Sequence, residues 1–177
     1  MKLTRFLALA TALAISAAPV SSETIKPKGG SALIGWFGPW YMTKTTFADG
    51  SRVCFAHNLS ANYTLPRLSI LSVVGGKDPG PWVQYQGRAD FPPNSQADLT
   101  IGKAGFKLGT GSEGPDPVLT PRNEKEAIQI VNALLDAEKG GQNRVSVTDG
   151  SGKSYKFSTR QTAKVVGYLE RNCDFKH

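Results

Sequence analysis

The 177-residue chain is poor in the residues that build metal centres and disulfide networks. It has two cysteines and two histidines, one of which is the last residue, His177. These counts exclude a disulfide-dense miniprotein and a four-cysteine zinc site, and they leave little material for a histidine-rich metal centre. Lysine and arginine form no continuous run and do not alternate with aromatic residues. We therefore expect no nucleic-acid partner.

Motifs that carry catalysis are also missing. The chain has no HExxH, GxSxG or EF-hand spacing. The glycine-rich stretch 109–114 lacks the Gly-Lys-Ser/Thr ending of a phosphate loop and precedes Pro115, which favours an ordinary connection. Four of the eight aspartates stand beside glycine or proline, where they serve turn geometry, and no carboxylate pair stands out. We predict no catalytic residue, no metal site and no cofactor, and hence a protein that is not an enzyme.

The N-terminus has the layout of a secretory signal peptide. Lys2 and Arg5 precede an apolar run over residues 6–18, and small residues follow up to Ser22. The alternative is a membrane anchor, but the run is shorter than the ~18 residues that cross a bilayer. We predict a signal peptide over residues 1–22, a periplasmic or secreted protein, and no transmembrane segment after cleavage.

The mature chain would keep 19 basic and 14 acidic residues, a net charge of +5. This excess favours anionic partners such as acidic glycans, or it serves solubility alone.

Export would place both cysteines in an oxidising compartment. We expect Cys54 and Cys173 to form one intramolecular bridge that ties the start of the fold to its last helix. A buried pair of thiols and an intermolecular bridge are the alternatives. His57 lies three residues from Cys54, on the opposite side of a strand, and is badly placed to activate it.

The periodicity predicts an α+β protein, with an antiparallel β-sandwich or curled sheet of about eight strands and two helices packed on it. Residues 23–32 would form a flexible leader and 33–177 a single domain, and the whole chain is 40% apolar, which is typical of globular proteins. We expect strands at 36–47, 52–58, 67–74, 82–89, 97–101, 105–108, 144–148 and 153–157.

Capping signals delimit the two predicted helices. Asn123 with Glu126 three residues later has the spacing of a capping box, and Gly140 follows the helix that this box would start. Ile128, Val131, Leu134 and Leu135 form its apolar stripe. The second helix is predicted over 159–172, with Ser158 and Gln161 as its capping box.

Aromatic residues are the strongest candidates for a binding surface. Trp36, Trp40 and Tyr41 cluster near the mature N-terminus, and Trp82 and Tyr85 lie on a later strand. Strand alternation puts Trp82 with Gln84 and Gln86, opposite Val83 and Tyr85. These five aromatic residues form either a binding platform or part of the core.

The order of elements resembles one known family. An aromatic strand at 36–40 precedes the Cys54 strand, an Arg-containing apolar strand at 67–74 and a Phe-containing hairpin at 105–108. These elements are followed by a helix, a Val-x-Val strand and a last helix that ends at Cys173. Over residues 33–175 this order is similar to the invasion-associated locus B family of proteobacterial envelope proteins. The family usually carries further cysteines, and no binding residue can be transferred from it.

The resemblance implies a periplasmic or secreted, non-enzymatic protein linked to envelope function and, in pathogens, to host-cell interaction and virulence. We therefore expect a protein that acts by binding an envelope or host protein, or an anionic glycan. One alternative is a periplasmic inhibitor that blocks a hydrolase with the loop 109–121 or the turn 75–81. Another is a weak hydrolase with carboxylates gathered from distant strands.

Overall fold

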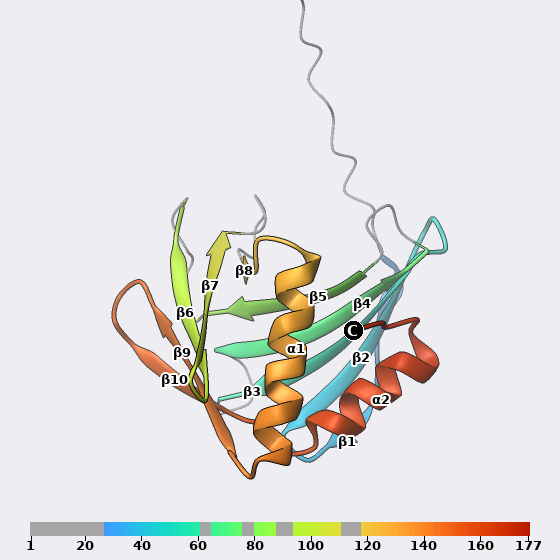
Figure 1. Cartoon of the computed structure of the whole chain (residues 1–177). Coiled ribbons are helices and arrows are strands. Elements are labelled where there is room, and N and C mark those ends of the chain that lie inside the picture. Colours follow the sequence, from blue (N-terminus) through green and yellow to red (C-terminus); the bar gives the residue numbers. More distant parts are fainter. Residues whose placement is uncertain (1–26, 61–64, 76–79, 88–93, 111–117) are drawn as a thin grey trace, which may run out of the picture.

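An antiparallel sheet that curls around a helix forms most of the structure. The computed structural model describes residues 27–60, 65–75, 80–87, 94–110 and 118–177. Its ten strands pair in the order β1-β2-β3-β4-β5-β8-β7-β6-β9-β10, and two helices pack on the sheet (Figure 1). The elements are β1 (Pro27–Phe37), β2 (Trp40–Phe47), β3 (Arg52–Leu59), β4 (Arg67–Val74), β5 (Gly80–Gln86), β6 (Gln96–Ile101), β7 (Ala104–Thr110), β8 (Leu119–Thr120), α1 (Glu124–Lys139), β9 (Arg144–Asp149), β10 (Ser154–Ser158) and α2 (Thr162–Asn172).

The predicted α+β class and curled sheet are confirmed, but the sheet has ten strands rather than about eight. The expected strand 36–47 is interrupted because Gly38, with a φ of +58°, turns the chain between β1 and β2. β1 begins at Pro27, so a leader over 23–32 is wrong from Pro27 onward. The other additional strand is β8, which lies in the segment expected to be a loop.

β8 joins the two halves of the sheet. Leu119 pairs with Tyr85 of β5, and both residues of β8 pair with β7. Two residues therefore connect strands β1–β5 to strands β6, β7, β9 and β10, and the sheet is continuous.

The core lies between the sheet and the helices. In β2–β5 every second side chain points to the helix-covered face, as a pleated strand requires, and Trp40, Leu68, Ile70 and Val83 on that face are fully buried. The Trp40 indole Nε1 donates to the carbonyl oxygen of Arg160 at 3.1 Å. Inward residues of β6, β7, β9 and β10 pack in the same cluster, so the chain has one core.

The predicted disulfide is confirmed. Cys54 of β3 and Cys173, directly after α2, are bonded, with their Cα atoms 6.3 Å apart. This excludes the buried thiol pair and the intermolecular bridge. The Ser72 hydroxyl donates to the Cys173 carbonyl at 2.6 Å, so the end of α2 is held to the sheet by a covalent bond and a hydrogen bond.

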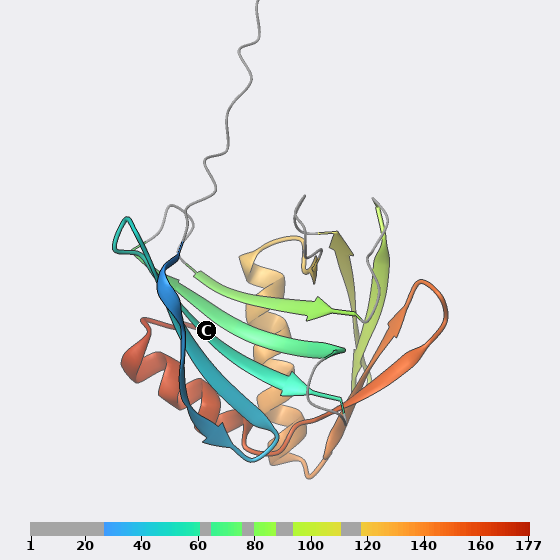
Figure 2. The ribbon, with the colours of Figure 1, turned by 180° about the vertical axis from the view of Figure 1, so that it is seen from behind.

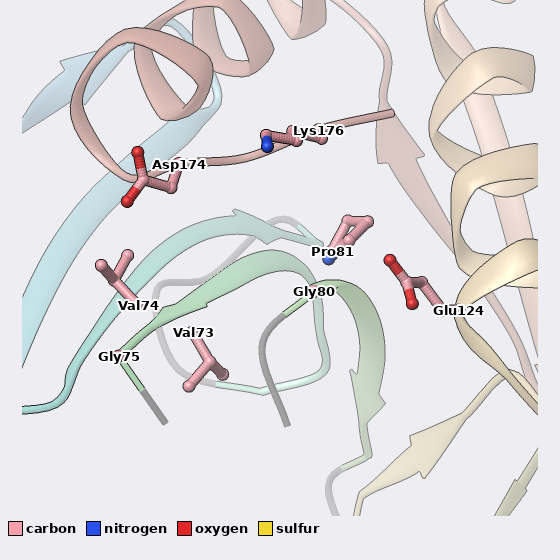
Figure 3. A pocket seen from close by; sticks show the side chains of 8 residues that line it. All are labelled: Val73, Val74, Gly75, Gly80, Pro81, Glu124, Asp174 and Lys176. Carbon is pink, nitrogen blue, oxygen red and sulfur yellow. The ribbon is translucent and has the colours of Figure 1, made fainter. Parts of the chain in front are cut away.

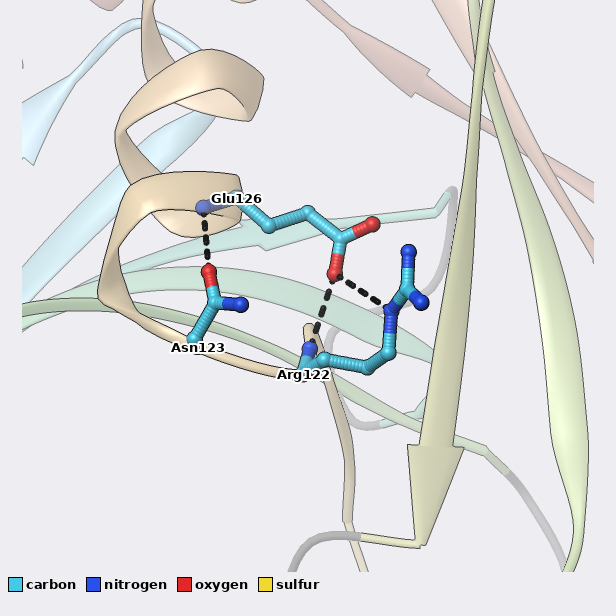
Figure 4. Close-up of polar contacts among 3 residues, drawn as sticks. All are labelled: Arg122, Asn123 and Glu126. Atoms are coloured by element: carbon cyan, nitrogen blue, oxygen red, sulfur yellow. Dashed lines mark hydrogen bonds and ion pairs between the residues drawn. The ribbon is translucent and has the colours of Figure 1, made fainter.

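The cap of α1 follows the sequence prediction closely. Asn123 Oδ1 accepts from the backbone N–H of Glu126 at 2.9 Å (Figure 4). The Glu126 carboxylate reaches back to the N–H of Arg122 at 2.9 Å, rather than to that of Asn123, and also pairs with the Arg122 side chain at 3.6 Å. The buried stripe is Ala127, Ile130, Val131, Leu134 and Ala137, whereas Ile128 and Leu135 are only half-buried at its margins.

The cap of α2 differs from the prediction. The helix starts at Thr162, and the residue before it, Gln161, is left-handed with a φ of 66° and makes no side-chain cap, so the Ser158–Gln161 box is wrong. Glu138 of α1 takes its place: its carboxylate accepts from the N–H groups of Gln161 and Ala163, the latter at 2.8 Å. A side chain distant in sequence therefore satisfies donors that would otherwise lack a partner at the helix start.

The predicted signal peptide, residues 1–22, lies outside the described residues. Among the residues that the structure describes, neither helix has the length and apolar character needed to cross a membrane.

Replacing Glu138 by alanine is expected to lower the free energy of unfolding by about 1 kcal/mol, because it removes the acceptor for two N–H groups at the start of α2. Urea denaturation measures this change. Asp136→Ala is the matched control, since Asp136 is an exposed acid on the same helix. Equal losses in the two variants would contradict the capping role.

Candidate functional site

The strands β1–β5 have one face covered by the helices and one face that neither helix covers, which we call the open face although residues such as His57 and Ser69 are buried within it. Strand alternation puts Tyr41 and Thr43 of β2, Phe55 and His57 of β3, and Arg67 of β4 on the open face. Figure 2 views this face, with both helices behind the sheet. The open face is where the described chain gathers rings and polar side chains outside the core.

Four rings form a continuous row across β1, β2 and β3. The ring centroids of Trp36 and Tyr41 are 5.3 Å apart, those of Tyr41 and His57 4.6 Å, and those of His57 and Phe55 5.1 Å. We call Trp36, Tyr41, His57 and Phe55 the ring row. At its outer end Trp36 is 55% exposed, and Leu33 beside it on β1 is 59% exposed. Apolar surface is therefore open to a partner at this edge.

A hollow of about 450 Å³ lies beside the ring row, within the range of ligand sites. We call it the outer-face hollow. Its described lining combines rings, hydroxyls and amides with one arginine, and it includes no aspartate or glutamate. The described lining residues are Ser31, Tyr41, Thr43, Thr45, Phe47, Phe55, His57, Arg67, Gln84, Gln86 and Val118.

His57 is held as a neutral ring. Its Nδ1 lies 2.8 Å from the Ser69 hydroxyl and its Nε2 lies 3.4 Å from that of Thr43. Burial and the positive charge of Arg67 lower the pKa of His57 to about 3. Near pH 7 the imidazole therefore carries no charge and is a poor proton acceptor, so its role is to link the rings.

Two buried polar atoms of the hollow have no hydrogen-bond partner among the described residues. They are Nε of Arg67 and Oε1 of Gln86, and Gln86 as a whole is only 9% exposed. Nη1 of Arg67 donates to the Tyr41 hydroxyl at 3.4 Å, and no carboxylate of the described chain pairs with this guanidinium. Buried polar atoms normally find a partner, and these two are themselves almost inaccessible to solvent, so contact with a ligand would fall to the more accessible groups of the lining.

The structure separates the five aromatic residues predicted to bind. Trp36, Tyr41 and Trp82 lie on the open face, Trp36 the most exposed. Trp40 and Tyr85 are fully buried on the helix-covered face, so a binding role for these two is wrong. Adjacent residues of a strand point to opposite faces, and this decides between Trp40 and Tyr41.

The polar residues of the hollow were missed at the sequence level. The alternation that puts Gln84 and Gln86 on the side of Trp82 was visible in the sequence. The pairing of β4 with β5 sets Arg67 opposite Gln86, and this pairing has no local signal.

A second hollow of about 460 Å³ lies at the ends of β4 and β5. Glu124 comes from the first turn of α1, and Asp174 and Lys176 come from the tail after α2 (Figure 3). In this view the Asp174 carboxylate points away from Glu124, so the two carboxylates do not face each other as a catalytic pair would. Within the described ranges, no three His, Cys, Asp or Glu side chains gather as metal ligands would.

The segments proposed as inhibitory wedges fall largely outside the described residues, which omit 76–79 and 111–117.

The lowered pKa of His57 predicts a pH-dependent stability. Below about pH 6.5 His57 of the unfolded chain binds a proton, whereas His57 of the folded chain stays neutral down to about pH 3. Acidification should therefore favour unfolding. This histidine contributes at most about 1.4 kcal/mol per pH unit. Urea denaturation at pH 7, 6 and 5 should show a steeper loss for the wild type than for His57→Gln. Parallel curves for the wild type and His57→Gln would contradict the buried neutral histidine.

Comparison of the chain with protein-family models, with curated proteins and with solved structures finds no match. The function must therefore be argued from the open face and the outer-face hollow themselves.

Proposed function

We propose that this protein is an exported, non-enzymatic binding protein whose ligand site is the open face of β1–β5. The single observation that carries the proposal is the exposed Trp36, whose ring centroid lies 5.3 Å from that of Tyr41 at the rim of a hollow lined by rings, hydroxyls, amides and one arginine. Exposed aromatic residues beside a concave polar surface are the usual anchors of binding sites.

Binding fits the chemistry of the hollow better than hydrolysis does. The described lining has no carboxylate, and its histidine has a pKa of about 3. No residue of this lining is therefore suited to transfer protons near neutral pH. Rings, hydroxyls and amides can still stack on a ligand and form hydrogen bonds with it.

The disulfide supports export. The bridge joins residues 119 positions apart, and such structural bridges persist in oxidising compartments. Together with the predicted signal peptide, it favours a periplasmic or secreted protein. The resemblance to the invasion-associated locus B family adds the proposal of an envelope or host partner, protein or anionic glycan, and a link to host-cell interaction.

Replacing Trp36 by alanine should weaken partner capture at least tenfold, because an exposed aromatic anchor is removed while the core is untouched. The chain from Glu23 onward, immobilised and exposed to envelope extract and to host-cell surface extract, provides the assay, with bound protein and glycan quantified. Lys125→Ala, an exposed substitution on α1, is the control. If Trp36→Ala retains the same material as the wild type, the open face is not the binding site.

Export is tested separately. The full chain expressed in a Gram-negative bacterium should appear in the periplasm or medium, begin at Glu23, and show no reactive thiol after denaturation without reductant. Mass spectrometry and thiol titration measure these outcomes. An unprocessed chain in the cytoplasm with two reactive thiols would overturn the export proposal.

A further inference from the structure

We propose that the outer-face hollow binds a carboxylate-bearing sugar unit of a glycan, with Arg67 on the carboxylate, Gln84 on a hydroxyl, and the ring row beside the sugar. This assignment rests on the proposed binding function of the open face and names its ligand class.

The described lining carries one positive charge and no negative charge, which favours one anionic group on the ligand. Arg67 is the only lysine or arginine of the described lining, and a guanidinium keeps its proton in proteins. No aspartate or glutamate lies in that lining, and His57 is neutral near pH 7. A single monovalent anion would compensate the charge. A carboxylate also matches the planar fork of the guanidinium.

The uncharged polar groups call for hydroxyls on the same ligand. Gln84 and Thr43 line the hollow and are half-buried, so the amide of Gln84 and the hydroxyl of Thr43 can exchange hydrogen bonds with hydroxyls of a ligand. A simple fatty acid would meet Arg67 but has no hydroxyl for the amides. A sugar acid carries both groups.

The ring row extends beyond the hollow, which favours a chain of sugars. Tyr41 lines the hollow and packs against Trp36 in a tilted arrangement, with the ring centroids 5.3 Å apart, and Trp36 is exposed. The apolar face of a sugar ring can pack on an aromatic ring. With one unit beside Tyr41, the next unit of the glycan would lie over Trp36.

A peptide C-terminus also carries a carboxylate, but it fits the position less well. Extended peptides usually add a strand to the edge of a sheet. Nine of the eleven described lining residues instead lie on β2–β5, with Ser31 alone from the edge strand β1, and β2, β3 and β4 have their backbone groups paired on both sides. The geometry therefore favours side-chain recognition of a glycan.

The test uses three acidic probes, sialyllactose, a glucuronate disaccharide and a galacturonate trimer, each beside its uncharged methyl ester. Isothermal titration with the wild-type chain from Glu23 onward should show at least one acid binding tenfold or more tightly than its ester. The emission of Trp36 should change with the bound acid, and Trp36→Phe should lose most of that change.

Arg67→Gln should bring the affinity for that acid down to the affinity for its ester. Arg52→Gln is the matched control, because Arg52 starts β3 on the opposite face, at the far end from Leu59, which pairs with Arg67. It should keep the wild-type preference. Thermal unfolding verifies that both variants are folded.

Equal affinities for all three acids and their esters in the wild type would overturn the proposal without any variant. A preference for a peptide with a free C-terminus over its amide, stronger than that for every acid, would overturn it in favour of a protein ligand. In both cases Trp36-dependent capture would still support the binding function. Loss of that capture would instead overturn the proposed function itself.

Discussion

The packing of two helices against one face of a curled sheet decides what each residue of β2–β5 can do. Because side chains alternate across the strands, burial of Trp40 and Ile70 under the helices sends Tyr41 and His57 to the other side. The core and the candidate site are therefore the two faces of the same strands. A shift of register by one residue would bury the ring row and expose the core.

The helices are held in place by contacts far apart in sequence. Glu138 of α1 caps the start of α2, and the disulfide fixes its end to β3. The Trp40 indole, on the sheet, bonds the carbonyl of Arg160 just before α2. α2 is thus defined by the tertiary structure at both ends, and its covering of the sheet keeps the opposite face as the available surface.

Local signals in the sequence predicted the elements of the fold that depend on neighbours in the chain. The Asn123–Glu126 cap formed because donor and acceptor are three residues apart, and the Cys54–Cys173 bridge followed from having only two cysteines. The predicted cap of α2 is wrong because Glu138, which belongs to the other helix, accepts from the N–H groups of Gln161 and Ala163. Strand β8 has two residues, too few to show a period.

The candidate site was only half predictable for the same reason. Composition identified the aromatic residues, and alternation separates Trp40 from Tyr41. The juxtaposition of Arg67 with Gln86 depends on the pairing of β4 with β5, and the neutrality of His57 depends on burial and on the charge of Arg67. Such features arise only when strands meet.

The two-residue strand β8 has a consequence for how the sheet responds to load. The pairing of β8 with β5 contains few ladder hydrogen bonds and therefore resists separation weakly. The long pairings β4–β5 and β6–β7 on either side resist separation strongly. α1 contacts both β5 and β6, so it bridges the two halves of the sheet that β8 joins. Side-chain packing of α1 against both halves therefore maintains the curvature of the sheet. Strands β1–β5, which carry the open face, can move as one rigid unit, with bending concentrated at β8.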